Sequence, residues 1–215
     1  MKKIINVLTA TRAEYGLLKP VITKLLKYDE FDLRIIVTGM HLSAKYGLTY
    51  KEIEEDGFVI DKKIEILDES NTEASISKSM GTALIKFSDY FQELKPNLLI
   101  VLGDRYETLA VCCAAMNARI PIAHLYGGET TEGAVDEAIR HAITKMSYLH
   151  FTSTSEYRKR VIQLGESPDR VYQVGALGIE NILNTNLLSK EELEKSIHFK
   201  LDQPFAVVTF HPVTL

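Results

Sequence analysis

The sequence over residues 97–107 is NLLIVLGDRYE, an apolar run followed at once by glycine and ionisable side chains. An uninterrupted apolar run predicts a strand of a parallel sheet that helices cover on both faces. Six more short runs of this kind are candidate strands, at 4–8, 33–38, 58–64, 120–124, 148–152 and 171–174. Strands that alternate with helical patterns predict an α/β fold with a doubly wound, Rossmann-like parallel sheet.

The segments between these runs have helical periodicity. Leu17, Val21 and Leu25 repeat every four residues, and a longer apolar stripe runs from Ile76 to Leu94. Further helices are predicted over 133–146 and 157–164, the first with a buried stripe that starts at Val135. Such stripes favour core packing over cofactor binding.

Composition indicates an ordinary globular protein. Of 215 residues, 46% are hydrophobic and 25% charged, and the formal net charge of -4 gives no sign of a nucleic-acid or anionic-membrane surface. No apolar run approaches the ~18 residues of a membrane span, and the apolar start at 4–8 is too short for a signal peptide. We therefore expect a cytoplasmic protein.

The two cysteines also fit a reducing compartment. Cys112 and Cys113 are adjacent, so they cannot easily bridge, and they are expected to be small buried hydrophobes. No CxxC or HxxxH pattern accompanies them, so no metal is expected.

The end of the chain predicts a change of domain. Residues 1–187 are expected to form the Rossmann-like domain, and 188–203 a linker with a helix that Ser189 and Glu192 cap. Residues 204–210 resemble a fresh strand, and His211 follows it. We therefore expect 204–215 to be the first strand of a second, truncated domain.

Ligands of open α/β sheets bind outside the carboxyl ends of the strands. Five predicted strand exits carry ionisable residues, glycine or both: Arg12 with Glu14 and Tyr15; Gly39 with His41; Gly103 with Asp104, Arg105 and Glu107; His124 with Gly127, Gly128 and Glu129; and His211. The accumulation predicts a site for a small anionic ligand.

Arg12 is expected at the start of the first helix, where a guanidinium and the helix N-terminus together favour phosphate or diphosphate. Neither GxGxxG nor GxxxxGK[ST] is present, which excludes the usual dinucleotide fingerprint and the P-loop. Asp104 has two interpretations, a helix N-cap or a site residue. Gly127 and Gly128 permit close backbone approach to a ligand or a positive φ.

The helix predicted over 133–146 carries two i, i+4 pairs, Asp136 with Arg140 and Glu137 with His141. One interpretation is an exposed helix with surface ion pairs. The other places Asp136 beside Glu129, where neighbouring carboxylates split their pKa values into one base and one acid.

Taken together, these motifs resemble the hydrolysing UDP-N-acetylglucosamine 2-epimerases of bacterial sialic-acid synthesis. The matching segments are TRAEYG at 11–16, VTGMH at 37–41, LGDRYE at 102–107, HLYGGE at 124–129, DEAIRHAITKM at 136–146, RVIQLGE at 160–166 and FHP at 210–212. Such a family implies the N-terminal half of a GT-B-like fold of two domains, with the active site between them. It also implies a UDP-sugar substrate, no cofactor and a homo-oligomer.

The resemblance and the strand exits together define the candidate site. Candidate catalytic residues are Asp104, Glu129, Asp136, Glu137 and His211. Candidate substrate-binding residues are Arg12, Tyr15, His41, Arg105, Glu107, His124, Gly127, Gly128, Arg140 and His141. Many relatives carry a catalytic glutamate where this chain has Tyr126, which makes Glu129 or Glu137 the expected substitute.

Several functions stay open at this point. A non-hydrolysing 2-epimerase, an epimerase of a related UDP-sugar such as UDP-diacetylbacillosamine, half of a GT-B glycosyltransferase and a nucleotide-sugar-binding module share many of these features. The clustered carboxylates count against simple anion binding. We expect the isolated chain to be inactive.

Overall fold

A computed structural model describes residues 2–70 and 72–209. Within these residues seven strands form one parallel sheet in the order β3-β2-β1-β4-β5-β6-β7. The strands are β1 Lys3–Thr9, β2 Phe31–Thr38, β3 Ile60–Ile64, β4 Leu98–Leu102, β5 Ile122–Leu125, β6 Leu149–Thr152 and β7 Val171–Gln173. The predicted doubly wound, Rossmann-like α/β fold is confirmed.

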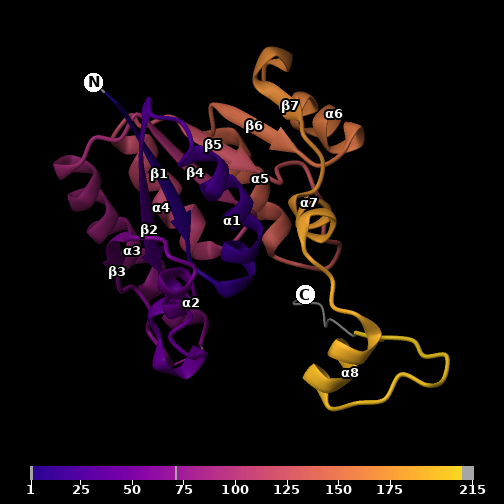
Figure 1. Cartoon of the computed structure of the whole chain (residues 1–215). Helices are drawn as coiled ribbons and strands as arrows, with labels where there is room; N and C mark the ends of the chain where they lie inside the picture. Colours follow the sequence, from indigo (N-terminus) through magenta and orange to yellow (C-terminus); the bar gives the residue numbers. More distant parts are fainter. Residues whose placement is uncertain (1, 71, 210–215) are drawn as a thin grey trace.

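Helices cover both faces of this sheet (Figure 1). The helices of the described residues are α1 Arg12–Leu25, α2 Tyr50–Glu55, α3 Glu73–Glu93, α4 Tyr106–Asn117, α5 Asp136–Met146, α6 Ser155–Gln163, α7 Leu177–Asn184 and α8 Lys190–Ile197, with short 3-10 turns at Gly39–Leu42, Ala44–Tyr46 and Pro168–Arg170. Helix α8 lies away from the sheet in Figure 1. No helix of the described residues combines the length and hydropathy needed to cross a bilayer.

Alternate residues of each central strand enter two separate cores, because successive side chains of a strand point to opposite faces. In β1, Val7 packs with Leu18 and Ile22 of α1 on one face. Leu8 packs on the other face with Phe87 of α3 and the apolar side of α4. The sheet is thus buried on both sides, as the apolar run at 97–102 predicts.

The start of α1 is locally encoded. The Thr11 side chain accepts the backbone N–H of Glu14, and the Glu14 carboxylate accepts the N–H of Thr11, which completes a capping box. The first helix therefore begins directly after β1 and sets the position of the loop at that strand end.

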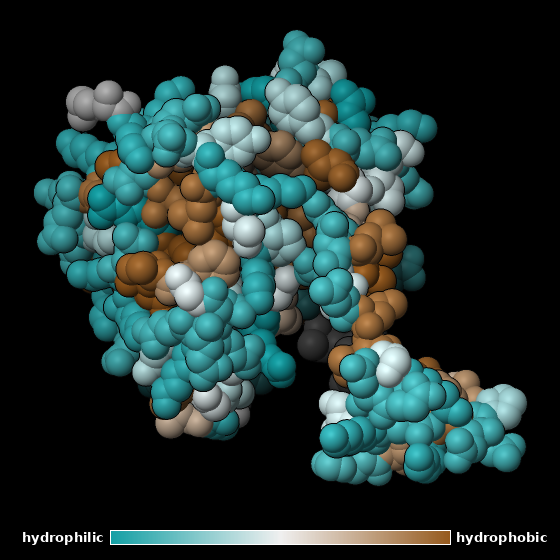
Figure 2. Space-filling model, in the orientation of Figure 1, coloured by the Kyte–Doolittle hydropathy of each residue, from teal (hydrophilic) through white to brown (hydrophobic). Residues whose placement is uncertain are grey.

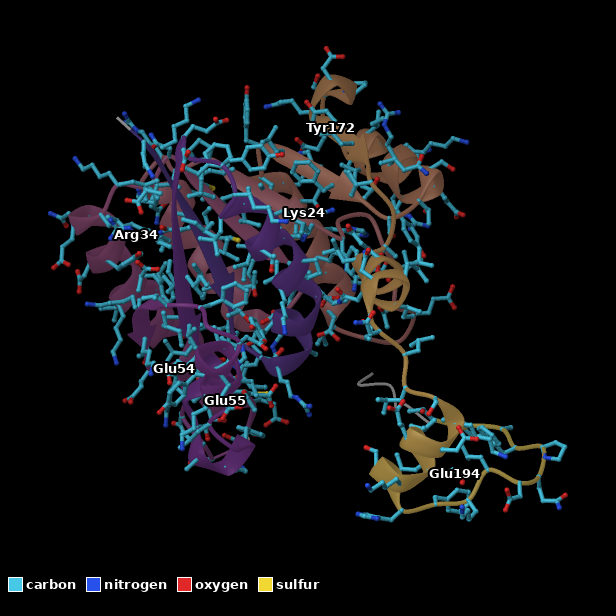
Figure 3. The ribbon with its side chains drawn as sticks, in the orientation of Figure 1. Lys24, Arg34, Glu54, Glu55, Tyr172 and Glu194 are labelled. Carbon is cyan, nitrogen blue, oxygen red and sulfur yellow. The ribbon has the colours of Figure 1, made fainter. Side chains whose placement is uncertain are left out.

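Helix α7 was not predicted, and it packs beside α1 (Figure 1). Lys24, labelled in Figure 3, pairs with Glu180, and the Asn181 side chain donates to the Gly16 carbonyl at 2.7 Å. Ile182 and Leu183 are exposed, and Figure 2 shows apolar surface where α7 lies. Polar contacts therefore hold α7 to α1 while apolar side chains stay at its surface.

Residues 204–209 pair with no strand of the described residues, and Val207 and Val208 are exposed, so the expected first strand of a second domain stays a prediction. One sequence prediction is wrong in the described residues. Val135 precedes α5 and is 49% exposed, so it is not part of the buried stripe. His211 lies outside the described residues.

Candidate active site

The candidate site lies at the carboxyl ends of β1 and β4, marked by the strand arrowheads in Figure 1. The chain adds β2 and β3 on one side of β1 and then returns to add β4 on the other. This reversal is the topological switch point at which open α/β sheets bind ligands. Asp104 and Arg105 follow β4 there, and Thr11 and Arg12 follow β1.

The floor of the site is a buried charged cluster. The Arg105 guanidinium forms two hydrogen bonds to the Glu107 carboxylate, at 2.8 and 3.2 Å, and Glu107 is fully buried. Glu14 lies within electrostatic reach of both, and its carboxylate accepts the backbone N–H groups of Ala10 at 2.7 Å and Thr11 at 3.0 Å. Burial raises the Glu14 pKa to about 7 against these stabilising bonds.

Gly39 explains how the β2 exit fits over this floor. Its φ is +58°, and a Cβ at this position would lie 3.1 Å from the Cβ and carbonyl oxygen of Ala10 and 3.4 Å from the Glu107 carboxylate. The backbone at the end of β2 can therefore approach the β1 loop only because this residue is glycine.

His41 lies beside the same buried cluster and contacts two hydroxyl groups. Its Nε2 lies 3.0 Å from the Thr9 hydroxyl and its Nδ1 lies 2.8 Å from the Thr49 hydroxyl. The ring is fully buried, and burial lowers its pKa to about 4. His41 is therefore neutral near pH 7 and orients hydroxyl groups, so it adds no positive charge for a phosphate.

Asp104 pairs with Arg140 of α5, which is 7% exposed. Burial raises the Asp104 pKa; Asp136 and Glu129 add to this rise and Arg140 opposes it. The N-cap position of α4 belongs to Arg105, so the helix-cap interpretation of Asp104 is wrong. Among the described residues the Arg140 guanidinium pairs with Asp104 and not with Asp136, which corrects the predicted i, i+4 pair.

Arg140 also has unused hydrogen-bonding capacity. Its Nε and Nη1 are buried and have no partner among the described residues. Buried guanidinium donors usually have acceptors, so these two atoms suit an oxygen-rich ligand beside Asp104.

The loop after β5 brings Glu129 toward this pair. The Ser153 hydroxyl donates to the Glu129 carboxylate at 2.6 Å. A Cβ on Gly128, whose φ is +82°, would lie 2.5 Å from the Tyr157 carbonyl, and a Cβ on Gly127 would lie 3.1 Å from His124 Nδ1. The close approach that these glycines permit is to α6 and to His124.

His124 connects β5 with β4 and α5. Its Nε2 donates to the Gly103 carbonyl at 2.7 Å, and its Nδ1 lies 3.2 Å from the Thr144 hydroxyl. Complete burial lowers the pKa of His124 to about 4, so the ring is a neutral brace. Nearby, Nε2 of His141 lies 3.6 Å from the Glu137 carboxylate, as the predicted i, i+4 pair requires.

Two candidates lie apart from the Asp104 pair. Arg12 begins α1 as predicted, but its guanidinium is exposed and pairs with Glu52 at 3.1 Å. Tyr15 is buried in the core, and its phenol donates to Asp56 at 2.6 Å. Its ring therefore serves the packing of α1 against α2.

Sequence reasoning did not predict two features of this edge. It counted Glu14 among the ionisable residues after the first strand but not among the candidate site residues, and the Thr11-x-x-Glu14 spacing of a capping box is the signal that points to its place beneath the β1 loop. Tyr126 has φ +67°, and its hydroxyl accepts the Gly178 N–H of α7 at 3.4 Å. No local pattern predicts this contact because α7 is distant in sequence.

These observations define a Rossmann-like α/β protein with a carboxylate–guanidinium pair at its switch point. The chain belongs to the UDP-N-acetylglucosamine 2-epimerase family, whose sequence model matches residues 23–215.

Two relatives are 47% identical to the whole chain. One is a GDP/UDP-N,N'-diacetylbacillosamine 2-epimerase (hydrolyzing) of Campylobacter jejuni, and the other is the polysialic acid biosynthesis protein P7 of Escherichia coli. The chain covers 56% and 54% of them, so it spans about half the length of these curated relatives.

The fold is also similar to that of solved structures. A crystal structure of a UDP-N-acetylglucosamine 2-epimerase superposes with a TM-score of 0.78 at 22% identity, over 88% of this chain and 53% of that one. The likeness in structure therefore also covers half of the larger protein.

Proposed function

We propose that this chain is part of a hydrolysing UDP-N-acetylglucosamine 2-epimerase, which converts its substrate to UDP and N-acetylmannosamine. The observation that carries the proposal is the pair between half-buried Asp104 and buried Arg140, with Glu129 and Asp136 close enough to raise the Asp104 pKa. Family membership and the name of the Campylobacter relative, a hydrolysing 2-epimerase, support it.

The reaction has two steps. A carboxylate removes the C2 proton, the C–H electrons form the C1–C2 double bond, and the anti C1–O bond breaks to release UDP and leave a glycal. Water then adds its hydroxyl to C1, and C2 receives a proton on the face opposite to the one from which the first proton was removed. Because the C2 proton is weakly acidic, the first step needs a positioned base and a stabilised diphosphate.

The carboxylates of this site suit proton transfer. Asp104 is partly desolvated, and burial raises its pKa, which makes the carboxylate a stronger proton acceptor. Glu129, Asp136 and Glu137 are the further candidates for the base and the acid. Tyr126 occupies the place of the usual glutamate and cannot replace it as a carboxylate base.

The cationic groups at the carboxyl edge of the sheet are the candidates for binding the anionic part of the substrate. Arg12 at the start of α1 is the candidate for the diphosphate, where the helix N-terminus adds favourable N–H groups. The free donors of Arg140 suit a sugar or phosphate oxygen. His211 is proposed to join them from outside the described residues.

The architecture of the whole protein is part of the proposal. Residues 1–187 are the N-terminal domain of a GT-B-like protein, 188–203 the connection and 204–215 the start of a second domain that completes the site. The protein is proposed to be cytoplasmic and homo-oligomeric, and the isolated chain inactive. Turnover by purified residues 1–215 would contradict this arrangement.

A second substrate has a specific observation in its favour. The relative from Campylobacter carries the name of a diacetylbacillosamine epimerase and is as similar to this chain as protein P7. UDP-diacetylbacillosamine has an acetamido group at C4 and no hydroxyl at C6, so the same elimination at C1 and C2 applies to it.

Proton NMR of the full-length protein in deuterated water tests the reaction and the substrate. Release of UDP with free N-acetylmannosamine deuterated at C2 is the expected result. Retention of the sugar on UDP indicates the non-hydrolysing reaction. A parallel sample with UDP-diacetylbacillosamine identifies the preferred sugar.

Asp104→Asn in the full-length protein tests the proposed acid–base role. We expect kcat to fall about 100-fold or more because the amide cannot exchange the proton, while the circular dichroism spectrum stays native. Asp89→Asn on the exposed surface of α3 is the matched control and is expected to keep its activity. Near-normal turnover by Asp104→Asn would remove Asp104 from the mechanism.

A further inference from the structure

The carboxylate of Glu166 bonds two residues that the proposed chemistry does not use. Its carboxylate accepts a hydrogen bond from Lys145 Nζ of α5 at 2.5 Å and another from His150 Nε2 of β6 at 3.2 Å. Glu166 is 7% exposed and His150 is fully buried, whereas the Lys145 side chain is half exposed. One buried carboxylate thus joins a helix of the candidate site to the sheet.

The segment that carries Glu166 also contacts the other acidic part of the site. Arg160 of α6 donates to the Gly128 carbonyl, next to Glu129. Gly128 lies so close to α6 that a Cβ would clash with the Tyr157 carbonyl. The stretch 155–166 therefore contacts both the Glu129 loop and α5.

Lys145 lies in the same helix as Asp136 and Arg140 of the candidate site. It lies nine residues after Asp136 in the same helix, or about 14 Å along the axis at ~1.5 Å per residue. Because a short helix moves as a rigid body, a shift at Lys145 displaces Asp136 and Arg140 as well. Arg140 in turn bonds the Asp104 carboxylate.

We propose that Glu166 is a positioning residue: through Lys145 and His150 it holds α5 against β6 and thereby sets the placement of the Asp104–Arg140 pair. This role rests on the proposed epimerase function. It places Glu166 outside contact with substrate, so its effect belongs to the rate of the chemical step more than to substrate binding.

The test compares full-length variants by steady-state kinetics with UDP-N-acetylglucosamine and with UDP-diacetylbacillosamine. Glu166→Gln keeps the shape but removes the charge, and Lys145→Met cuts only the link to α5. Each is expected to lower kcat about 10- to 100-fold with KM changed less than about 3-fold, because small misplacement of catalytic groups has effects of this size. The double variant is expected to lose no more than the stronger single variant.

Glu54→Gln is the matched control, since Glu54 also bonds a lysine, Lys63, at 2.7 Å. Glu54 lies far from α6 in Figure 3, and its variant is expected to keep kcat. Lower melting temperatures with wild-type kcat at 25 °C in both test variants would overturn the positioning role. No turnover of either sugar by the wild-type protein would overturn the proposed function and this role with it.

Discussion

Replacing Glu14 by glutamine should make the protein more stable above neutral pH. Glu14 is 7% exposed beneath the β1 loop, beside Glu107 and Arg105. Its carboxylate accepts the N–H groups of Ala10 and Thr11 through a single oxygen, and the amide oxygen of glutamine can accept them too. The substitution therefore removes a buried charge and keeps the capping bonds.

The magnitude follows from the pKa of Glu14, which burial raises from 4.5 to about 7. Between pH 4.5 and pH 7, Glu14 stays protonated in the folded state but has lost its proton in the unfolded state. The stability that Glu14 contributes by binding this proton is complete below pH 4.5 and disappears as pH rises through 7. At about 1.4 kcal/mol per pH unit, the wild-type protein loses about 3 kcal/mol of this contribution between pH 4 and pH 8.

Urea unfolding at intervals from pH 4 to pH 8 measures the difference between Glu14→Gln and the wild type. Other titrating groups are common to both proteins, so the difference isolates Glu14. We expect it to change by about 3 kcal/mol in favour of the variant as pH rises. Glu55→Gln, at an exposed position labelled in Figure 3, is the control. A difference for Glu14→Gln that stays constant with pH would refute the reasoning.

Two further predictions concern the packing of the site. Gly128→Ala should lower the free energy of unfolding by about 3 kcal/mol or more, because its Cβ would lie 2.5 Å from the Tyr157 carbonyl. Gly175→Ala, with φ +87° and open space around the new Cβ, should lower it by only about 1–2 kcal/mol. Thermal unfolding compares the two variants, and equal losses of stability would contradict the packing argument. His41→Gln should make the free energy of unfolding depend less on pH in acid. Burial lowers the pKa of His41 from 6.5 to about 4, so the wild type loses up to about 3 kcal/mol of stability as pH falls from 6.5 to 4. Urea unfolding between these pH values measures this loss, and an equal loss in His41→Gln would count against the reasoning.

The strands were predictable because their signal is local. The apolar run at 97–102 became β4 with a boundary changed by one residue, since a strand buried on both faces needs apolar side chains throughout. The expected strand over 204–210 is also mostly apolar, yet 204–209 pair with no strand of the described residues. A strand depends on hydrogen bonds from a neighbour, which composition does not supply.

Hydrogen-bond partners were less predictable than positions. The sequence places Asp136 and Arg140 one helical turn apart, but Arg140 bonds Asp104, 36 residues away. Gly127 and Gly128 were expected to permit a close approach to a ligand or a positive φ; Gly128 has φ +82°, and the structure packs both glycines against His124 and α6. These outcomes depend on how α5 and α6 dock on the sheet.

By itself, the sequence determined the α/β class, the parallel sheet and the strand ends where ionisable residues gather, because periodicity and composition act over a few neighbouring residues. Only the tertiary structure decided that Asp104 is the partner of buried Arg140, that His41 and His124 are neutral rings that orient their neighbours, and that Glu166 joins α5 to β6. Burial and long-range pairing set these roles, since both depend on segments far apart in the chain.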